Sequence, residues 1–573
     1  MLYKWKGIYV SIIDYPFDSG EILKRKRSIK RKILEQSGFL EKRIAILSGS
    51  TVGDVRDILE LFLLHFGIKP QFYIGQYNQY YEEVIFENQE LVEFEPDLIY
   101  IHTSSRNLSD GGLLEKLQSV WAKIKSDYSC PVIQNNFEIP ACGFDFDSRL
   151  VSSLNVKLDD WARENSDFYI NDIQYLSAQF GLDKWFNEQD YYLYKYAFCV
   201  SAIPILCYNI AKIIKSAYGK NQKCLVLDLD NTLWGGVVGD VGVMGIDLGM
   251  GSALGEAYIT FQKYVKSLHD KGVILAVCSK NDERIAKEAF SNPNMVLQLE
   301  DIAVFCANWD SKAENILKIA KQLNILPESI VFIDDNPAER ELVRQAIPDV
   351  KVPEVNTVVD FAWHIESAGY FYATKILSED KRRNEYYAAD TKRNELKNTF
   401  IDYGEYLQSL KMSSEICSFI SVHLERITQL INKTNQFNLT TKRYSQSEVE
   451  KIAADPNFIT IYATLDDKFG SNGIVSALIG EIVERTLHIR LWVMSCRVFK
   501  RELELAVFDY LVEVCKRENL ETLVGYYFKT EKNGYVDSLL GNLGFYESGN
   551  NTWEFDLTAE YHNKNKYLKI NRS

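Results

Sequence analysis

Short apolar runs alternate with longer amphipathic segments over much of the chain. In the first part, runs within 43–51, 71–74, 95–102 and 131–135 are separated by segments with helical spacing, such as Val52–Phe66. Strands that alternate with helices in this way predict a parallel sheet with helices on both faces. The pattern therefore indicates an α/β domain at the start of the chain.

The middle of the chain repeats this pattern, and the last part departs from it. Runs at Cys224–Asp228, Val273–Ser279 and Ser329–Asp335 predict the buried strands of a second α/β domain. The last part mixes helices with strands such as Gly473–Val483 and Thr486–Val493, which predicts an α+β domain. The predicted fold class is therefore multidomain α/β. We expect a lead with a basic helix at 1–40, a first α/β domain at 41–218, a second at 219–365, a helical linker at 366–410, an α+β domain at 411–558 and a polar tail at 559–573.

Composition narrows the class of protein. A chain of 573 residues is too long for one core, and 46% apolar with 25% charged residues is typical of soluble globular proteins. The ten cysteines follow no framework spacing and form no CxxC pair, which favours reduced thiols and argues against structural zinc. No signal peptide is recognised and no apolar run reaches the length of a membrane span, so we expect a cytoplasmic protein.

Charge argues against one further class of protein. A net charge of −14 makes general binding to nucleic acids unfavourable. The run Lys24–Lys32 is a local basic exception. It predicts either a solvated helical face or a docking patch for an acidic partner.

Polar residues stand at the carboxyl tips of the strands of the second α/β domain. They are Asp228 and Asp230, then Ser279, then Lys312, then Asp334 and Asp335. Carboxylates are costly to bury unpaired, so those at the strand ends imply a hard cation such as Mg²⁺. The alternative is a degenerate site in which the aspartates only cap helices.

The ordered set resembles the haloacid-dehalogenase-like (HAD) phosphotransferase superfamily. The resemblance implies that Asp228 attacks phosphorus, that Asp230 acts as general acid and base, and that Ser279 and Lys312 bind the phosphoryl oxygens. Mg²⁺ would be held by Asp228, the Asp230 carbonyl, Asp334 and Asp335. Only 51 residues separate Asp228 from Ser279, and 33 separate Ser279 from Lys312. Neither gap holds a large lid, so we expect an open site that suits a bulky substrate.

The wording of the motifs is similar to that of FkbH-like proteins. The matching segments are Lys223–Asp240, Cys278–Asp282, Phe332–Arg340 and Leu430–Thr440. The resemblance implies an SGNH-hydrolase-like (flavodoxin-like) domain, a HAD-like Rossmannoid domain and a GNAT-acyltransferase-like domain. It also implies dephosphorylation of a three-carbon acyl substrate of the 1,3-bisphosphoglycerate type and loading of glyceryl onto the phosphopantetheine arm of an acyl carrier protein. Within or next to the motifs, the expected substrate-binding residues are Thr232, Lys280, Asn281 and Asn336.

The first domain departs from the SGNH pattern. Ser50, Gly75 and Asn107 stand where a nucleophile and an oxyanion hole are expected, but the late position has no histidine. A serine without a base is a poor nucleophile, so we expect scaffolding or substrate docking from this domain.

The last domain departs from the GNAT pattern. Lys500 and Glu502 stand where glycines would form a pyrophosphate cradle, whereas a phosphopantetheine arm lacks that pyrophosphate. Cys496 lies beside Arg497, and as a thiolate it would hold an acyl thioester; the alternative is an inert buried cysteine. A basic face is expected from Arg426, Lys433, Lys442, Arg443, Arg497, Lys500 and Arg501.

Three hypotheses for the function follow. The first is a Mg²⁺-dependent phosphatase that also transfers an acyl group to a carrier protein. The second is a small-molecule phosphatase whose outer domains are not catalytic. The third is an interaction module without catalysis. The completeness of the HAD-like set favours the first.

Overall fold

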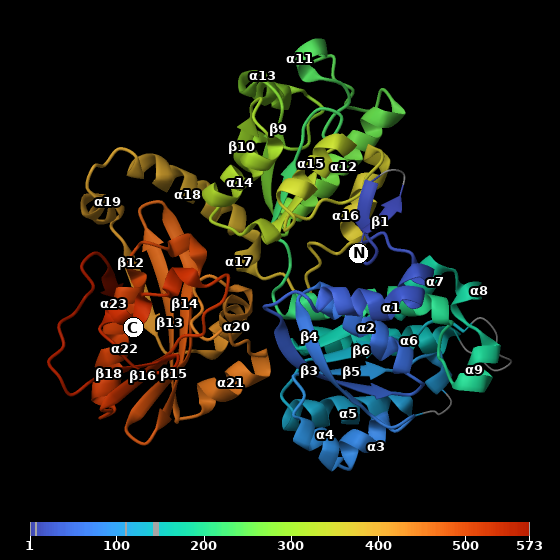
Figure 1. Cartoon of the computed structure of the whole chain (residues 1–573), viewed down its shortest axis with the longest axis horizontal. Helices are drawn as coiled ribbons and strands as arrows, with labels where there is room; N and C mark the ends of the chain where they lie inside the picture. Colours follow the sequence, from blue (N-terminus) through green and yellow to red (C-terminus); the bar gives the residue numbers. More distant parts are fainter. Residues whose placement is uncertain (1, 6–7, 109–111, 141–147, 572–573) are drawn as a thin grey trace. The chain divides into compact units, whose positions relative to one another are not determined.

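The computed structural model divides into two compact units, and Figure 1 shows their helices and strands. The structure describes residues 2–5, 8–108, 112–140 and 148–571. The first unit is Met1–Lys220 together with Arg443–Ala454, and the second is Asn221–Lys442 together with Asp455–Ser573. A segment of the predicted last domain, around α21 (Gln446–Ala454), therefore belongs to the first unit.

The first unit is built on a parallel five-stranded sheet with the order β4-β3-β5-β6-β7. This order is the flavodoxin-like doubly wound arrangement. The strands are β3 (Leu40–Ser48), β4 (Ile68–Ile74), β5 (Leu98–His102), β6 (Val132–Asn135) and β7 (Phe168–Asn171). The apolar run Ile44–Leu47 is fully buried at its centre, as expected of a strand covered on both faces.

Helices and a short hairpin complete the first unit. The helices are α1 (Ser19–Ile33), α2 (Gly53–His65), α3 (Tyr80–Ile85), α4 (Gln89–Phe94), α5 (Leu113–Asp127), α6 (Ser148–Glu164), α7 (Ile173–Phe180), α8 (Leu182–Trp185), α9 (Glu188–Tyr194) and α10 (Ile203–Ala217). The 3₁₀ turns are η1 (Ser105–Asn107) and η2 (Val200–Ala202), and the hairpin pairs β1 (Leu2–Trp5) with β2 (Ile8–Ser11).

The basic helix α1 packs against α2 of its own unit. Lys26 Nζ lies 2.8 Å from Asp54 Oδ1 and 3.0 Å from Asp57 Oδ2, and Lys30 Nζ lies 2.7 Å from Glu60 Oε2. Part of the predicted basic patch is thus neutralised by the acidic face of α2. Neither prediction for Lys24–Lys32, a solvated helical face or a docking patch for a partner, included ion pairs with a helix of the same unit.

Val200–Ala217, which comprises η2 and α10, is the one described segment long and apolar enough for a membrane span by length and composition. In the structure 61% of this window is buried. Its apolar character is therefore accounted for by packing within the first unit, where α10 contacts α2.

The second unit begins with a parallel four-stranded sheet with the order β10-β9-β8-β11. The strands are β8 (Cys224–Leu227), β9 (Ile274–Ser279), β10 (Ile302–Ala307) and β11 (Ile330–Ile333). The helices around it are α11 (Val238–Val241), α12 (Ala253–Asp270), α13 (Glu283–Glu288), α14 (Lys312–Gln322), α15 (Pro337–Ala346) and α16 (Val358–Ser367), with 3₁₀ turns η3 (Ala289–Ser291), η4 (Leu299–Asp301) and η5 (Pro327–Ser329). The bridge at 366–410 holds α17 (Ser378–Lys381), α18 (Arg383–Lys397) and α19 (Tyr403–Leu410).

The rest of the second unit is an α+β domain on an eight-stranded sheet with the order β17-β18-β16-β15-β14-β13-β12-β19. The strands are β12 (Ser413–Cys417), β13 (Phe458–Asp467), β14 (Gly470–Val483), β15 (Thr486–Met494), β16 (Thr522–Tyr526), β17 (Tyr546–Gly549), β18 (Thr552–Asp556) and β19 (Lys569–Asn571). The helices are α20 (Leu424–Lys433), α22 (Leu503–Arg517) and α23 (Leu539–Leu543), with 3₁₀ turns η6 (Ser421–His423), η7 (Cys496–Val498) and η8 (Gly534–Val536).

Strands β15 and β16 run parallel, but they pair only over Thr486–Ile489 and Thr522–Gly525. Beyond that point the segment after α20 lies beside β15. Leu439 N donates to Trp492 O at 3.4 Å, and Met494 N donates to Phe437 O at 3.2 Å. The chain thus fills part of the gap between the two diverging strands itself.

The described part of the polar tail, 559–571, is anchored to the α+β domain. The backbone amides of Lys564 and Asn565 donate to the Asp509 carboxylate, and β19 pairs with β12. The sequence predicts the polarity of this segment but gives no sign of these contacts.

Candidate functional site

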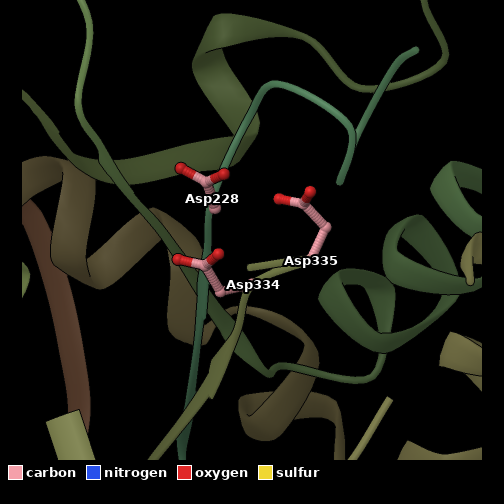
Figure 2. Close-up of side chains that lie close together, drawn as sticks. All are labelled: Asp228, Asp334 and Asp335. Carbon is pink, nitrogen blue, oxygen red and sulfur yellow. The ribbon is translucent and has the colours of Figure 1, made fainter. Parts of the chain in front are cut away.

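The register of β8 and β11 sets two acidic residues side by side. Leu227 is paired with Ile333, so Asp228 and Asp334 follow from neighbouring positions at the carboxyl end of the sheet. The backbone holds this arrangement, because Asp228 N donates to Ile333 O at 2.9 Å. Figure 2 shows the carboxylates of Asp228, Asp334 and Asp335 directed toward a common space.

These three side chains form the cluster of possible metal ligands in the described part of the chain, with one oxygen of each within 4.8 Å of the others. Asp228 and Asp334 are buried. Lys312 Nζ lies 2.9 Å from Asp228 Oδ1 and also contacts Asp334. One ammonium cannot balance three carboxylates, and oxygen donors of this type suit a hard divalent cation. The residues present therefore fit Mg²⁺.

Burial shifts the proton affinities at this cluster. Loss of hydration raises the pKa of Asp228 to about 7, against the opposing effect of the Lys312 charge. The pKa of Asp335 is raised by burial and then by the Asp334 charge. Burial alone would lower the pKa of Lys312, but the carboxylates of Asp228 and Asp334 raise it above its ordinary value. A divalent cation would have to displace a proton from Asp228 at neutral or lower pH.

The Asp230 carboxylate is held apart from the three-carboxylate cluster by three donors. Oδ1 accepts from Trp234 Nε1 at 2.9 Å and from Val238 N at 3.0 Å, and Oδ2 accepts from Asn281 Nδ2 at 2.8 Å. The next residue, Asn231, has a φ of 56°, a left-handed conformation that asparagine tolerates. The turn fixes Asp230 in one orientation, as a positioned acid or base requires.

The other predicted residues surround the cluster. Ser279 is buried at the end of β9 and hydrogen-bonds Asp228. Thr232 Oγ1 accepts from Asp335 N at 3.2 Å, and Asn336 Oδ1 accepts from Ala338 N at 2.9 Å as the cap of α15. Lys280 Nζ lies 2.6 Å from Glu339 Oε1. Through these contacts, Thr232, Asn336 and Lys280 support the backbone and α15 around the site.

Arg340 is a supporting residue that the sequence reasoning missed. Its Nη1 donates to the carbonyl oxygens of Asp334 and Asp335 at 2.8 and 2.9 Å, and the side chain is buried. The signal was its place in the motif Phe332–Arg340, because a cation one turn into the helix after an acidic pair can reach back to that pair's carbonyls.

Cys496 lies elsewhere in the second unit, in η7 after β15. Its thiol is half-buried, and its carbonyl accepts from Asn324 Nδ2 at 2.7 Å. Among the described residues it is not part of the acidic cluster. Any role for this thiol therefore belongs to a second site.

The loop after β15 keeps the backbone shape that glycines would provide. Lys500 and Glu502, which replace the expected glycines, have φ values of 63° and 58°. Between them, Arg501 is buried and paired with Asp390 and Asp467. The prediction that Arg501 belongs to an exposed basic face is therefore wrong.

Among the described residues, no hydrogen bond joins Ser50 of the first unit to a base. Asn107 Nδ2 donates to Gly49 O at 3.2 Å, whereas the buried Ser50 Oγ has no hydrogen-bond partner among the described residues. His102 Nδ1 lies 2.6 Å from the Tyr100 hydroxyl inside the core, and burial lowers its pKa to about 4. These contacts give Ser50 no activating group within the part of the chain that is described.

The chain is similar to a known family and to a solved structure. Residues 144–215 match the model of the FkbH N-terminal domain. The N-terminal part of the protein BF1531 from Bacteroides fragilis, which contains a phosphatase domain and was crystallised with Mg, is 31% identical to this chain. That likeness has a TM-score of 0.56 and covers 62% of this chain and 99% of the other.

Two acetyltransferases resemble a smaller part of the chain. The ribosomal-protein-S18-alanine N-acetyltransferase of Escherichia coli is 12% identical, with a TM-score of 0.20, and covers 27% of this chain and 99% of its own. A GNAT-family acetyltransferase of Staphylococcus aureus Mu50 is 12% identical, with a TM-score of 0.21, and covers 25% and 99%. A search of curated proteins finds no match.

Proposed function

Because the chain belongs to the family of the Bacteroides fragilis protein BF1531 and carries a match to the FkbH N-terminal domain, we propose that it is a Mg²⁺-dependent phosphatase of the HAD type. The observation that carries the proposal is the acidic cluster of Asp228, Asp334 and Asp335 around Lys312 at the carboxyl end of a parallel sheet. Ligands bind at this end of open α/β sheets.

The proposed reaction has two steps, and Asp228 acts in both. In the first, an Asp228 oxygen attacks phosphorus, the bond from phosphorus to the leaving oxygen breaks, and Asp230 gives that oxygen a proton. In the second, Asp230 takes a proton from water, the water oxygen attacks the aspartyl-phosphate, and phosphate leaves. Lys312 balances negative charge on the transferred group.

Mg²⁺ would be held by the side chains of Asp228, Asp334 and Asp335 together with the Asp230 carbonyl. When bound, it supplies positive charge to the phosphoryl oxygens and fixes their orientation. Arg340 and Thr232 hold the backbone of Asp334 and Asp335 in place for this task.

The finer proposal is the acyl transfer expected from the FkbH-like motifs. The substrate would be a phosphorylated three-carbon acyl compound of the 1,3-bisphosphoglycerate type, and glyceryl would be loaded onto the phosphopantetheine thiol of an acyl carrier protein. The thiolate of the carrier arm, or of Cys496, would attack the acyl carbon, form a thioester and break the acyl C–O bond, so that inorganic phosphate leaves. The remaining phosphoester would then be cleaved through Asp228, and an acyl group held on Cys496 would pass to the carrier thiol by thioester exchange. Support comes from the half-buried free thiol of Cys496. The proposal also requires a reducing setting such as the cytoplasm, which would keep this thiol reduced.

The second candidate is a small-molecule phosphatase whose outer domains only bind and position. The two are separated by incubating the protein with Mg²⁺, bisphosphoglycerate and a holo carrier protein. A glyceryl adduct on the carrier, seen by mass spectrometry, supports transfer. Phosphate release without any adduct on carrier or enzyme supports the plain phosphatase and contradicts the transfer.

We expect phosphate release to stop when Mg²⁺ is removed and to return when it is restored. Since Asp228 must lose its proton to bind the ion, Mg²⁺ affinity should rise as the pH is raised to about 7 and change little above it. Below that pH the affinity should fall roughly tenfold per unit, because one proton competes with the ion. Calorimetric titration with Mg²⁺ from pH 5.5 to 8 would measure this, and an affinity that is flat over that range would contradict it.

We also expect Asn281→Ala to slow turnover by about tenfold, because it removes one of three hydrogen bonds that orient Asp230. The substrate KM should change little, since Asn281 Nδ2 donates to Asp230 Oδ2 and acts through that residue. A suitable control is Asn542→Ala, which removes an exposed side-chain amide that donates to Ser538 Oγ in the last domain. Equal turnover in the two variants would show that Asn281 does not position Asp230.

A further inference from the structure

A small cavity of about 100 Å³ lies within the second unit, between the linker helices, α20 and the loop after β15. Lys223 and Ser329, which immediately precede β8 and β11, line part of this cavity. Asp228 and Asp334 follow the other ends of the same two strands. Four strand residues extend about 13 Å, so the cavity and the acidic cluster occupy opposite ends of the sheet.

The walls of this cavity carry an excess of positive charge. Five of the lining side chains are cationic and two are carboxylates, in a chain whose net charge is −14. The cations are Lys223, Arg383, Arg426, Lys433 and Arg497. They come from four different segments, so the fold collects them against the overall charge of the protein.

One carboxylate, Asp380, takes up part of this charge. It is buried, and its Oδ1 contacts Arg383 and lies 3.1 Å from Lys433 Nζ. Gln429 donates to its other oxygen and accepts from Arg426. Burial opposes ionisation of Asp380, but Lys433 and Arg383 hold its pKa down to about 2. Asp380 is therefore a fixed anion that neutralises about one of the surrounding cations.

Two guanidinium groups keep unused donors at this place. Arg426 Nε and Arg497 Nη1 are buried and have no hydrogen-bond partner among the described residues. A buried donor on a charged group is costly to leave unpaired. Burial first, and then Arg383, lowers the pKa of Lys433 to about 7, and burial with Arg497 lowers that of Arg426 to about 10. These groups lack sufficient negative charge around them.

We propose that this cavity is a second anion site, separate from the acidic cluster, which binds a phosphate group between Arg426, Lys433 and Arg497 beside the Cys496 thiol. A phosphate group offers several acceptor oxygens in a tetrahedral arrangement, which matches donors that approach from separate elements better than a flat carboxylate does. The volume suits a single phosphate with a short attached chain and is too small for a whole nucleotide cofactor.

The phosphate group could belong to a phosphorylated three-carbon acid, which would bring its reacting carbon near Cys496. It could also belong to a phosphopantetheine arm, whose thiol is at the far end of the arm from the phosphate. The assignment does not rest on the phosphatase reaction, because anion binding is measured without Mg²⁺. A failure of catalysis and a failure of this site are therefore distinguishable.

The test is calorimetric titration of the full chain with inorganic phosphate in EDTA, alongside the rate at which iodoacetamide alkylates Cys496, followed by peptide mass spectrometry. We expect phosphate to bind and to slow alkylation of Cys496. Arg426→Gln and Arg497→Gln should each weaken phosphate binding about ten- to a hundredfold, as expected for loss of a charged donor. The control is Arg485→Gln, an exposed arginine paired with Glu521 outside the cavity, which should bind like the wild type.

Repeating the titration with 3-phosphoglycerate, 4′-phosphopantetheine and pantetheine identifies the source of the phosphate. Tighter binding of either phosphorylated compound than of inorganic phosphate supports the site and names its ligand, and pantetheine should not bind. The proposal is overturned if phosphate neither binds nor protects Cys496, or if both cavity variants bind phosphate as the wild type does. Arg497→Gln, in a loop, keeps the test valid should Arg426→Gln fail to fold.

Discussion

Asp228→Asn is expected to reduce phosphate release by at least about a thousandfold, because it removes the oxygen that attacks phosphorus. The substitution preserves shape, but an amide cannot form the acyl-phosphate intermediate. It also leaves Lys312 next to a single buried carboxylate, Asp334. The measurement is phosphate release with Mg²⁺ across a panel of phosphorylated metabolites, together with acid-quenched detection of phosphorylated protein, which the variant should lack.

The matched control for this variant is Asp310→Asn. Asp310 lies in the loop after β10, two residues before Lys312, where its exposed carboxylate pairs with Lys318. It should keep activity close to that of the wild type. If Asp228→Asn stays folded and retains phosphate release within tenfold of the wild type, Asp228 is not the nucleophile, and the proposed two-step reaction is wrong.

The positions around Asp228 show what sequence alone can predict. A strand is recognised from its apolar run, and the carboxyl ends of parallel strands share one edge, so Asp228, Ser279 and Asp334 could be placed together before any coordinates. Their register could not, because it depends on the pairing of Leu227 with Ile333. The partners of Lys280 and Asn336 could not be predicted either. Whether such a side chain contacts substrate or a neighbouring helix depends on distances across the sheet.

Contacts between residues far apart in the chain escaped the sequence reasoning more completely. The cavity beside Cys496 is lined by residues from segments near positions 223, 324, 380, 426 and 497. No local sequence pattern predicts that these segments are in contact. The position of α21 in the sequence predicts that it belongs to the last domain. However, Ser445, just before this helix, donates to Ser129 O, and Ser447 within it donates to Asp167, both in the first unit. Such contacts are made by tertiary packing, which amphipathic spacing does not encode.

The buried ion-pair cluster of Arg393, Asp390, Asp467 and Arg501 is another such contact. Arg393 binds Asp467 through two nitrogens, at 2.7 and 2.9 Å, and Arg501 bridges Asp467 and Asp390 at 3.2 and 2.8 Å. The cluster links α18, the end of β13 and the loop after β15. Asp467 has no exposed surface on its side chain, and its carboxylate accepts hydrogen bonds from both arginines and from Phe469 N.

Asp467→Asn should destabilise the last domain by about 3 to 5 kcal/mol, since two buried guanidinium groups would be left with one carboxylate. Hydrogen exchange of peptides from β13 and β14 reports the free energy of local opening. A loss of about 3 kcal/mol should accelerate the exchange of these peptides roughly a hundredfold. The control is Asp537→Asn. Asp537 pairs with Lys529 at 3.5 Å, and both side chains are exposed, so this substitution should lower the stability of the domain by less than about 1 kcal/mol. Equal exchange in the two variants would mean that the buried cluster adds no more than a surface pair.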